Sequence, residues 1–367
     1  MKNKISNYFS LALSVMVLPL CLLAFTSCKD KKEATQTTEE PTTEEVTKDE
    51  AVKTEKVTAA QLIEKWQSKE IKVEKGGKEP DIVTLLKAFN SGWETQVVSD
   101  LLSEAKDPNF TRSINRDTGG GTIADRKNGY AEVRAGDTDG DDMNAAVWKR
   151  KNGHRLFMVN IVTPQNDNHG LPDKQALCIY DYDPDTQTLK PEQNAISQFT
   201  TTKDQYLIYK FPQTGTTVNI GERDKENVTK WNFFTWDGDK FTKKGNYTED
   251  QLNKMIVGTW VKAEKDKPAL TFTITYDQNE GYMLSDCGIY GSTEYEAYHT
   301  INDGFLYISS INEEEEEQPE LECTFEIVNQ NQLKGMYYFR QNGGKESRGN
   351  ITLKRGEPEN LLADYAE

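Results

Sequence analysis

The chain has 367 residues, and its 60 acidic and 44 basic side chains give a formal net charge of −16. A surface this negative repels the phosphate backbone of nucleic acid, so nucleic acid is excluded as an expected partner. The length exceeds what one small hydrophobic core normally organises, and we therefore expect two folded domains.

The first 27 residues have the pattern of an export signal. Lys2 and Lys4 precede an apolar stretch from about Phe9 to Phe25, and small residues follow just before Cys28. A basic start, a short apolar core and small residues at the end are typical of a signal peptide that is removed. The alternatives are an ordinary secretory signal that is cut elsewhere and an uncleaved single-pass anchor.

Phe25-Thr26-Ser27-Cys28 resembles the lipobox of bacterial lipoproteins, although Phe25 stands where Leu or Val is usual. The resemblance implies that the thiol of Cys28 is linked to a diacylglycerol, that residues 1–27 are removed, and that the new amino group is acylated, for example with palmitate. Two or three acyl chains hold a protein firmly, since each buried methylene contributes roughly 0.8 kcal/mol. We therefore expect a protein of the cell envelope, lipid-anchored in the outer membrane of a Gram-negative bacterium.

Residues 28–56 form an acidic segment rich in Thr and Glu. The segment has almost no apolar side chains to bury, so nothing offsets the entropy that ordering would cost. The sequence therefore predicts a disordered linker that separates the membrane anchor from the folded part of the chain.

Residues 57–247 combine helical and strand patterns. A capping-box sequence, Thr58-Ala-Ala-Gln61, precedes a short helix, and Asp81 opens a second helical stretch that Asn90-Ser91-Gly92 kinks or splits. Beyond Pro108 the apolar residues gather in short runs bounded by turn residues. These runs are 130–134, 145–149, 156–162, 176–182, 206–211 and 231–236. We expect an α+β domain whose helices pack on an antiparallel β-meander.

Residues 248–356 have the pattern of an all-β domain, and residues 357–367 form a C-terminal tail. A second capping box, Thr248 to Gln251, opens a short helix that ends near Met255. Eight strand-like runs follow, at 258–263, 269–276, 281–286, 293–299, 304–309, 321–327, 332–340 and 349–355. Eight short antiparallel strands with tight connections favour an up-and-down barrel, with a generic small barrel or a half-open sheet as the alternative.

Gly258-Thr259-Trp260, at the start of the first of these runs, resembles the Gly-x-Trp motif of lipocalins and of lipocalin-like domains in bacterial lipoproteins. The resemblance implies an eight-stranded lipocalin-like barrel in which Trp260 is structural and plugs the base. It also implies an arginine over the tryptophan ring, a place for Arg355 or Arg348.

The two barrel runs that alternate most regularly, 269–276 and 321–327, predict how the interior is occupied. Their apolar faces would point inward, and bulky residues on short strands would fill a barrel of this size. We therefore expect the domain to serve protein contact or stability more than the transport of a lipophile. The inward residues would be Leu270, Phe272, Ile274, Tyr276, Leu321, Phe325 and Ile327.

Residues typical of catalysis are scarce. His154, His169 and His299 lie far apart, and no metal-binding or nucleophile motif surrounds them, so surface or strand-edge positions are expected. The run Gly119 to Gly121 follows no predicted strand and precedes no Lys-Ser/Thr pair, so it is interpreted as a flexible loop rather than a phosphate-binding loop.

Three cysteines remain once Cys21 and Cys28 are set aside: Cys178, Cys287 and Cys323. A Cys287–Cys323 bridge is compatible with an oxidising compartment. Buried free thiols are the favoured alternative, because free cysteine behaves as a small core residue.

One acidic cluster resembles a calcium loop. Asp137, Asp139 and Asp141 alternate as in the Asp-x-Asp-Gly-Asp loops that bind Ca²⁺ through carboxylate oxygens. However, Asp142 and Trp148 stand where an EF-hand needs a glycine and a bidentate glutamate. An acidic hairpin turn is the favoured alternative, because Asp and Gly favour turns without a metal. Ca²⁺ is the one cofactor considered, and otherwise none is expected.

Two classes of function fit these features. The first is a non-enzymatic binding or scaffolding module, tethered to the membrane by its lipid, with an unknown protein or glycan ligand. The alternative is an envelope hydrolase that acts on carbohydrate through carboxylates of the α+β domain. The scarcity of catalytic motifs favours the first, and no catalytic residue is assigned. Two carboxylates about 5–10 Å apart across an aromatic-lined cleft would favour the second.

Overall fold

The structure, a computed structural model, describes residues 59–115, 118–137, 140–164, 174–199, 201, 206–224, 227–262, 270–289, 293–294, 297–309, 320–340 and 346–356. The predicted signal peptide, the linker with Cys28, and the tail lie outside the described residues, as do Asp139 and His169. All described residues belong to one compact unit that spans Thr54–Glu367. Within the described part of the chain, no helix combines the length and the apolar character needed to cross a membrane.

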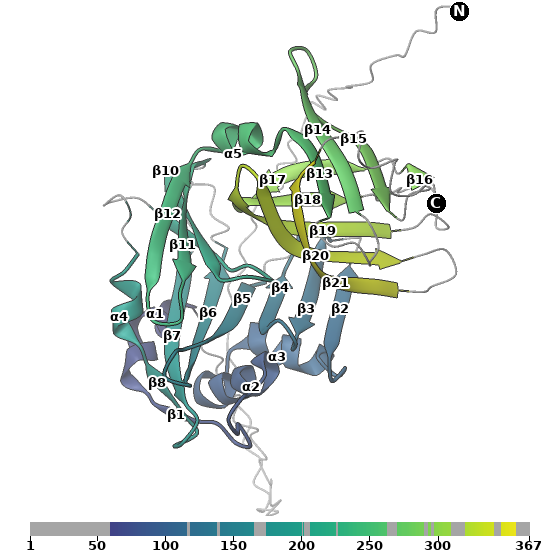
Figure 1. Cartoon of the computed structure of the whole chain (residues 1–367). Coiled ribbons are helices and arrows are strands. Elements are labelled where there is room, and N and C mark those ends of the chain that lie inside the picture. Colours follow the sequence, from purple (N-terminus) through teal and green to yellow (C-terminus); the bar gives the residue numbers. More distant parts are fainter. Residues whose placement is uncertain are drawn as a thin grey trace, which may run out of the picture. The chain divides into compact units, whose positions relative to one another are not determined.

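Antiparallel sheets make up most of the fold, and helices are few (Figure 1). The largest part of the first half is an eight-stranded sheet, called sheet A, in the order β1-β8-β7-β6-β5-β4-β3-β2. Its strands are β1 Ile71–Lys72, β2 Phe110–Asn115, β3 Gly120–Asp125, β4 Tyr130–Arg134, β5 Asp142–Lys149, β6 Arg155–Thr163, β7 Lys174–Asp183 and β8 Thr188–Pro191.

Three helices pack on one face of sheet A: α1 (Ala59–Lys65), α2 (Ile82–Trp93) and α3 (Gln96–Glu104). A short 3₁₀ turn, Trp66–Ser68, follows α1. The Asp81 carboxylate caps α2 by accepting a hydrogen bond from the Thr84 backbone N–H at 2.8 Å. Glu94, with a left-handed φ of 52°, ends α2, so the predicted break falls just after Asn90–Gly92.

The glycine run predicted as a flexible loop belongs instead to a strand. Gly120 and Gly121 open β3, and only Gly119, with a φ of 68°, lies in the turn before it. A side chain at Gly121 would place its Cβ 2.6 Å from the Ser113 carbonyl oxygen of β2. Glycine is required there because the neighbouring backbone passes so closely.

A four-stranded meander, sheet B, packs on the other face of sheet A. Its order is β12-β11-β10-β9, and the short helix α4 (Gln193–Ile196) precedes it. The strands are β9 Tyr206–Lys210, β10 Thr217–Asp224, β11 Asn227–Trp236 and β12 Phe241–Tyr247. Trp148 of sheet A makes edge-to-face contacts with Phe211 and Phe241, with ring centroids 6.1 Å apart in each pair.

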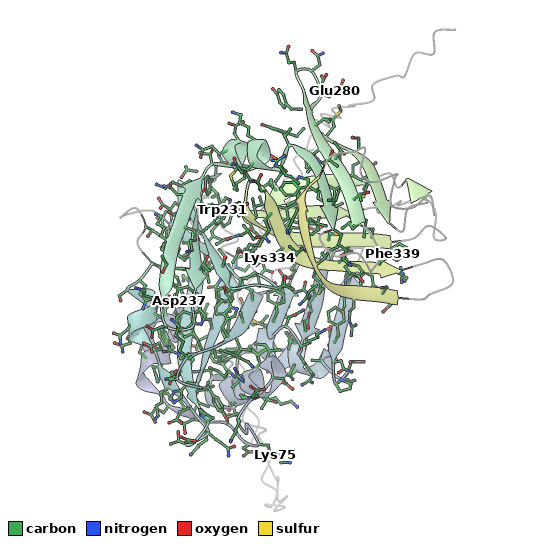
Figure 2. All side chains as sticks on the ribbon, viewed as in Figure 1. Lys75, Trp231, Asp237, Glu280, Lys334 and Phe339 are labelled. Atoms are coloured by element: carbon green, nitrogen blue, oxygen red, sulfur yellow. The ribbon has the colours of Figure 1, made fainter. Side chains whose placement is uncertain are left out.

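Strand β11 contributes to two hydrophobic cores. Phe234 and Trp236 belong to the core that sheet A forms, whereas Trp231 and Phe233, on the opposite face of the strand, belong to the core of the last third of the chain. Figure 2 labels Trp231 on this strand. A strand buried on both faces has a nearly continuous apolar run, as residues 231–236 do. The packing therefore crosses the domain boundary expected near residue 247.

The last third of the chain begins with α5 (Glu249–Ile256), whose predicted capping box is present: Thr248 and Gln251 bond each other's backbone N–H groups. A nine-stranded sheet, sheet C, follows in the order β16-β15-β14-β13-β21-β20-β19-β18-β17. Its strands are β13 Gly258–Lys262, β14 Leu270–Asp277, β15 Gly281–Ile289, β16 Thr293–Glu294, β17 Tyr298–Asn302, β18 Phe305–Ser309, β19 Glu320–Asn329, β20 Gln332–Arg340 and β21 Glu346–Arg355.

Sheet C curls into a nearly closed eight-stranded barrel. Its first strand, β13, pairs with its last, β21, so the two chain ends of the barrel close on each other. Among the described residues, the ladder is interrupted only between the β15–β16 edge and β17. The predicted run 293–299 is wrong as one strand: it resolves into the two-residue β16, which pairs only with β15, and the start of β17.

The barrel interior is filled by its own side chains. Trp260, Phe272, Ile274, Leu321 and Phe325 are completely buried in one apolar cluster. Tyr276, predicted to point inward, is instead 58% exposed. The reason is the register, because pairing between β14 and β13 stops at Ile274 and the remaining residues pair only with β15. The β14–β15 hairpin thus extends beyond the barrel, with Glu280 near its tip (Figure 2).

Candidate functional site

A cavity of about 310 Å³, here called the inter-sheet cleft, lies between sheet A and the outer face of the barrel. Strands β2, β3 and β4 form one wall, and β18, β19 and β20 form the other. The loop 211–213 adds to the lining. Because both walls are sheet faces, the register of each sheet decides which side chains line the cleft.

On the wall formed by sheet A, cross-strand partners place charged residues in rows. Arg112 lies opposite Ile123, which lies opposite Glu132. In the next row Gly121 lies between Ile114 and Arg134. Partners in an antiparallel sheet share a face, so both arginines and Glu132 lie on the face that lines the cleft.

On the barrel wall, outward residues alternate with inward core residues. Tyr307, Thr324 and Met336 form one cross-strand row that lines the cleft. The next cross-strand row on the same wall consists of Ser309, Glu322 and Tyr338, and these three residues also line the cleft. The intervening Cys323 and Ile308 are buried in or beside the barrel core.

An ion pair joins the two walls. The Arg112 guanidinium of β2 contacts the Glu322 carboxylate of β19. The same guanidinium lies 4.1 Å from the centroid of the Tyr338 ring, a cation–π distance. The Arg112 side chain is 12% exposed and that of Glu322 is 32% exposed, so the arginine is the more shielded member of the pair.

The second ion pair lies within β4. Arg134 Nε donates to Glu132 Oε1 at 2.9 Å, and Arg134 Nη2 donates to Glu132 Oε2 at 3.1 Å. This two-point contact fixes both planar groups. The adjacent Glu132 carboxylate raises the pKa of Arg134 above its ordinary range. Burial raises the pKa of the Tyr130 and Tyr307 hydroxyls, which lie beside this pair.

Further polar contacts join sheet B to the barrel outside the cleft. Lys210 Nζ lies 3.0 Å from the Asp303 carboxylate, and Asn219 Nδ2 donates to the Asp303 carbonyl oxygen at 3.1 Å. The Thr217 hydroxyl donates to the Glu326 carboxylate. These contacts between sheet B and the barrel lie outside the lining of the cleft.

One hydroxyl in the cleft lining lacks a visible partner. Ser309 Oγ is buried, and within the described part of the chain no group forms a hydrogen bond with it. A buried polar atom without a partner costs about 1–3 kcal/mol. A hydroxyl or amide of a bound ligand would offset that cost.

The predicted calcium ligands are described only in part. Asp137 and Asp141 are described, and Asp139 lies outside the described residues. The Asp137 backbone N–H donates to the Thr118 carbonyl oxygen at 2.8 Å, which joins the segment before β3 to the segment after β4. Burial raises the pKa of the Asp141 carboxyl. Among the described residues, no group of three or more acidic, His or Cys side chains is placed to hold a metal. The calcium loop stays a prediction.

Trp260 lies in the barrel core, where it is completely buried. Its indole N–H donates to the Ile256 carbonyl oxygen at 2.7 Å. The Arg355 guanidinium lies 4.8 Å from the Trp260 ring centroid, the place that the lipocalin resemblance implies for an arginine. Arg348 instead lies 3.9 Å from the Phe110 ring centroid.

Cys178, Cys287 and Cys323 are free and buried, which is the alternative that the sequence favoured. Burial raises the pKa of all three thiols, and raises that of Cys287 to about 12. Such thiols are poor nucleophiles, because the thiolate is the reactive form. They are core residues.

The described histidines lie apart from the cleft. His154 Nδ1 lies 2.6 Å from an Asp181 carboxylate oxygen, and Arg150 pairs with the same carboxylate at 2.8 Å. His299 lies on β17 and is not among the residues that line the cleft.

Sequence reasoning missed all four charged residues of the cleft. The sequence does carry one signal, because Glu132 and Arg134 alternate with Ala131 and Val133 and so mark one polar strand face. Nothing in the sequence shows that residues near 112–134 meet residues near 307–338.

Comparisons with known proteins add little. No protein-family model matches the chain, and no curated protein matches it. Among solved structures, a domain of an uncharacterized protein from Porphyromonas gingivalis matches with 8% identity, covering 40% of this chain and 87% of that chain, at a TM-score of 0.29. This similarity supports no argument about function. The fold itself defines a mostly antiparallel β protein with a nearly closed eight-stranded barrel.

Proposed function

We propose that the chain is a lipoprotein of the cell envelope, anchored through Cys28 in the outer membrane of a Gram-negative bacterium, and that it binds a ligand without changing it chemically. The anchor is supported by the export signal and the lipobox-like sequence before Cys28. The observation that carries the binding function is the inter-sheet cleft, whose aromatic walls surround arginines and glutamates already paired with one another.

Because side chains fill the barrel interior, the inter-sheet cleft is the better candidate for a ligand site. Small-ligand sites usually enclose about 300–1,000 Å³, and the cleft, at about 310 Å³, falls at the lower end of that range. Inside the barrel, Trp260, Phe272 and Phe325 occupy the space that a lipocalin would offer to a lipophile. A ligand of this protein would therefore bind outside the barrel.

The ion pairs favour binding over catalysis. A glycosidase needs one carboxyl group that holds a proton at working pH and gives it to the leaving group. Glu132 and Glu322 each contact an arginine, and these contacts hold both carboxylates in place within the walls of the cleft. Such pairs suit the fixed orientation of a ligand better than proton transfer.

The anchor is tested by Cys28→Ser in the native host. The wild-type chain should incorporate radiolabelled palmitate and sediment with membranes, whereas the variant should remain uncleaved or soluble and unlabelled. An unmodified mature N-terminus at another residue, found by mass spectrometry of the wild type, would remove the lipoprotein proposal.

The binding function is tested by filling the cleft. Thr324→Trp places a bulky ring on the barrel wall of the cleft, and Thr275→Trp makes the same change at an exposed barrel position outside it. A ligand at 100 times its Kd adds about 2.7 kcal/mol of stability. In thermal-shift screens with oligosaccharides, peptides and lipophiles, a stabilising compound should lose its effect only in Thr324→Trp. An equal effect in both variants would contradict the proposal.

A carbohydrate hydrolase is the second candidate, favoured by one observation: Glu132 and Glu322 line opposite walls of the same aromatic cleft. If the chain were such an enzyme, it would release reducing ends from an oligosaccharide, and Glu132→Gln and Glu322→Gln would each abolish that release. Turnover that survives both substitutions would exclude these two residues.

A further inference from the structure

We infer that the ligand of the inter-sheet cleft is a neutral carbohydrate, held through its hydroxyls by the two arginine–glutamate pairs and through its ring by the tyrosines beside them. The inference rests on the proposed binding function and adds the chemical class of the ligand. Three features of the cleft lining support it: the balance of charges, the hydrogen-bonding groups and the mixture of polar and apolar side chains.

The charges of the lining cancel. Its charged residues are two arginines, Arg112 and Arg134, and two glutamates, Glu132 and Glu322. Each guanidinium contacts one of these carboxylates. A charged ligand would have to compete with one member of a pair for its partner, and Arg112 or Glu132, the less exposed member of each pair, would then lose the charge that balances it. A neutral ligand disturbs neither pair.

The pairs nevertheless offer hydrogen bonds in a fixed geometry. Guanidinium groups are donors only and carboxylates are acceptors only, whereas a hydroxyl group both donates and accepts. Two neighbouring hydroxyls of a sugar ring can therefore bridge the donor and the acceptor of one pair. Ser309 Oγ, which has no hydrogen-bond partner among the described residues, lies in the same cross-strand row as Glu322 and supplies a further contact for a hydroxyl.

The other side chains of the lining favour a sugar over a lipophile as the ligand. Half of the lining residues carry polar side chains, including Tyr130, Tyr307 and Tyr338. A lipophile would leave the buried Ser309 Oγ without a partner among the described residues, and a buried polar group without a partner is costly. A tyrosine has an apolar ring and a polar tip, which matches a molecule with C–H faces and hydroxyl edges.

The experiment is isothermal titration calorimetry of the full mature chain with neutral oligomers of glucose, mannose and N-acetylglucosamine, and with uronic acid and sulfated oligomers. At least one neutral probe should bind. Its Kd should rise about tenfold or more in Glu132→Gln and in Glu322→Gln, since hydrogen bonds to charged groups contribute most. Glu249→Gln, an exposed glutamate on α5, is the matched control and should leave the Kd unchanged.

Thr324→Trp should also abolish binding of that probe. This variant tests the proposal independently if a glutamine variant folds poorly. Binding of only a charged probe, a peptide or a lipophile that Thr324→Trp abolishes would overturn the carbohydrate class and leave the binding function standing. Binding of no probe by the wild type, or binding that Thr324→Trp leaves unchanged, would overturn both.

Discussion

At the scale of single residues, the barrel depends on the contact between Trp260 and Arg355. Arg355 covers the indole ring, and its Nη2 donates to the Met255 carbonyl oxygen at 2.7 Å near the end of α5. A further N–H of the guanidinium bonds the Val257 carbonyl oxygen. Gly258, with a φ of 130°, leaves room for the guanidinium, because a Cβ there would collide with it. One arginine thus joins the helix, the first strand and the last strand.

Trp260→Ala should lower the free energy of unfolding by about 3–5 kcal/mol, as for other large aromatic truncations in a core. Chemical denaturation of the purified mature chain measures this. Trp260→Phe, which keeps most of the ring volume, should cost clearly less. An alanine variant as stable as the wild type would show that the ring is not part of the core.

Glu326 should make stability depend on pH. Burial raises the pKa of this carboxyl above the ordinary value for glutamate. A carboxyl with a raised folded-state pKa gives its full stability only at low pH, and loses it as pH rises through the folded-state pKa. Glu326→Gln keeps an acceptor for the Thr217 hydroxyl and should raise the melting temperature at pH 7 but not at pH 4. An equal effect at both pH values would contradict the assignment.

At the scale of elements, the edge of sheet B is covered by amide side chains of sheet A. Gln175 Nε2 donates to the Leu207 carbonyl oxygen of β9 at 2.6 Å. Asn144 and Asn160 each donate to the Tyr209 carbonyl oxygen at 3.2 Å. An open strand edge invites pairing with other chains, and these amides occupy it.

Gln175→Leu should therefore cost about 1–3 kcal/mol, because the buried backbone groups of β9 lose their partner. Faster hydrogen exchange of residues 206–210 should accompany the lower stability. Lys174→Leu, the neighbouring exposed position, is the control and should change neither quantity. Unchanged exchange in β9 would mean that its edge is satisfied in another way.

The sequence predicts those elements whose apolar residues alternate or recur regularly. Two predicted strands, 130–134 and 332–340, have the same bounds as β4 and β20 in the structure. Strands β3 and β12 are missed, because the Gly120–Gly121 pair and the Lys243–Lys244 pair break the apolar pattern. The cleft is not predictable in the same way, since Arg112 and Glu322 meet only through packing between distant segments.

At the scale of the whole molecule, the two cores depend on one strand. Trp231 and Phe234 lie on opposite faces of β11 and belong to different cores. Cooperative unfolding is expected when buried contacts link all parts of a unit. Calorimetry of the mature chain should therefore show one transition, and Trp231→Ala should lower its midpoint without splitting it. Two well-separated transitions in the wild type would contradict this account.

The central claim is that the ligand binds in the inter-sheet cleft and not inside the barrel. Hydrogen–deuterium exchange of the mature chain, with and without a bound oligosaccharide, tests this claim most directly. The account predicts new protection in residues 110–115 and 130–134 of sheet A together with 305–309 and 320–340 of the barrel wall. Protection confined to the strands away from the cleft, such as 270–277 and 281–289, would contradict it.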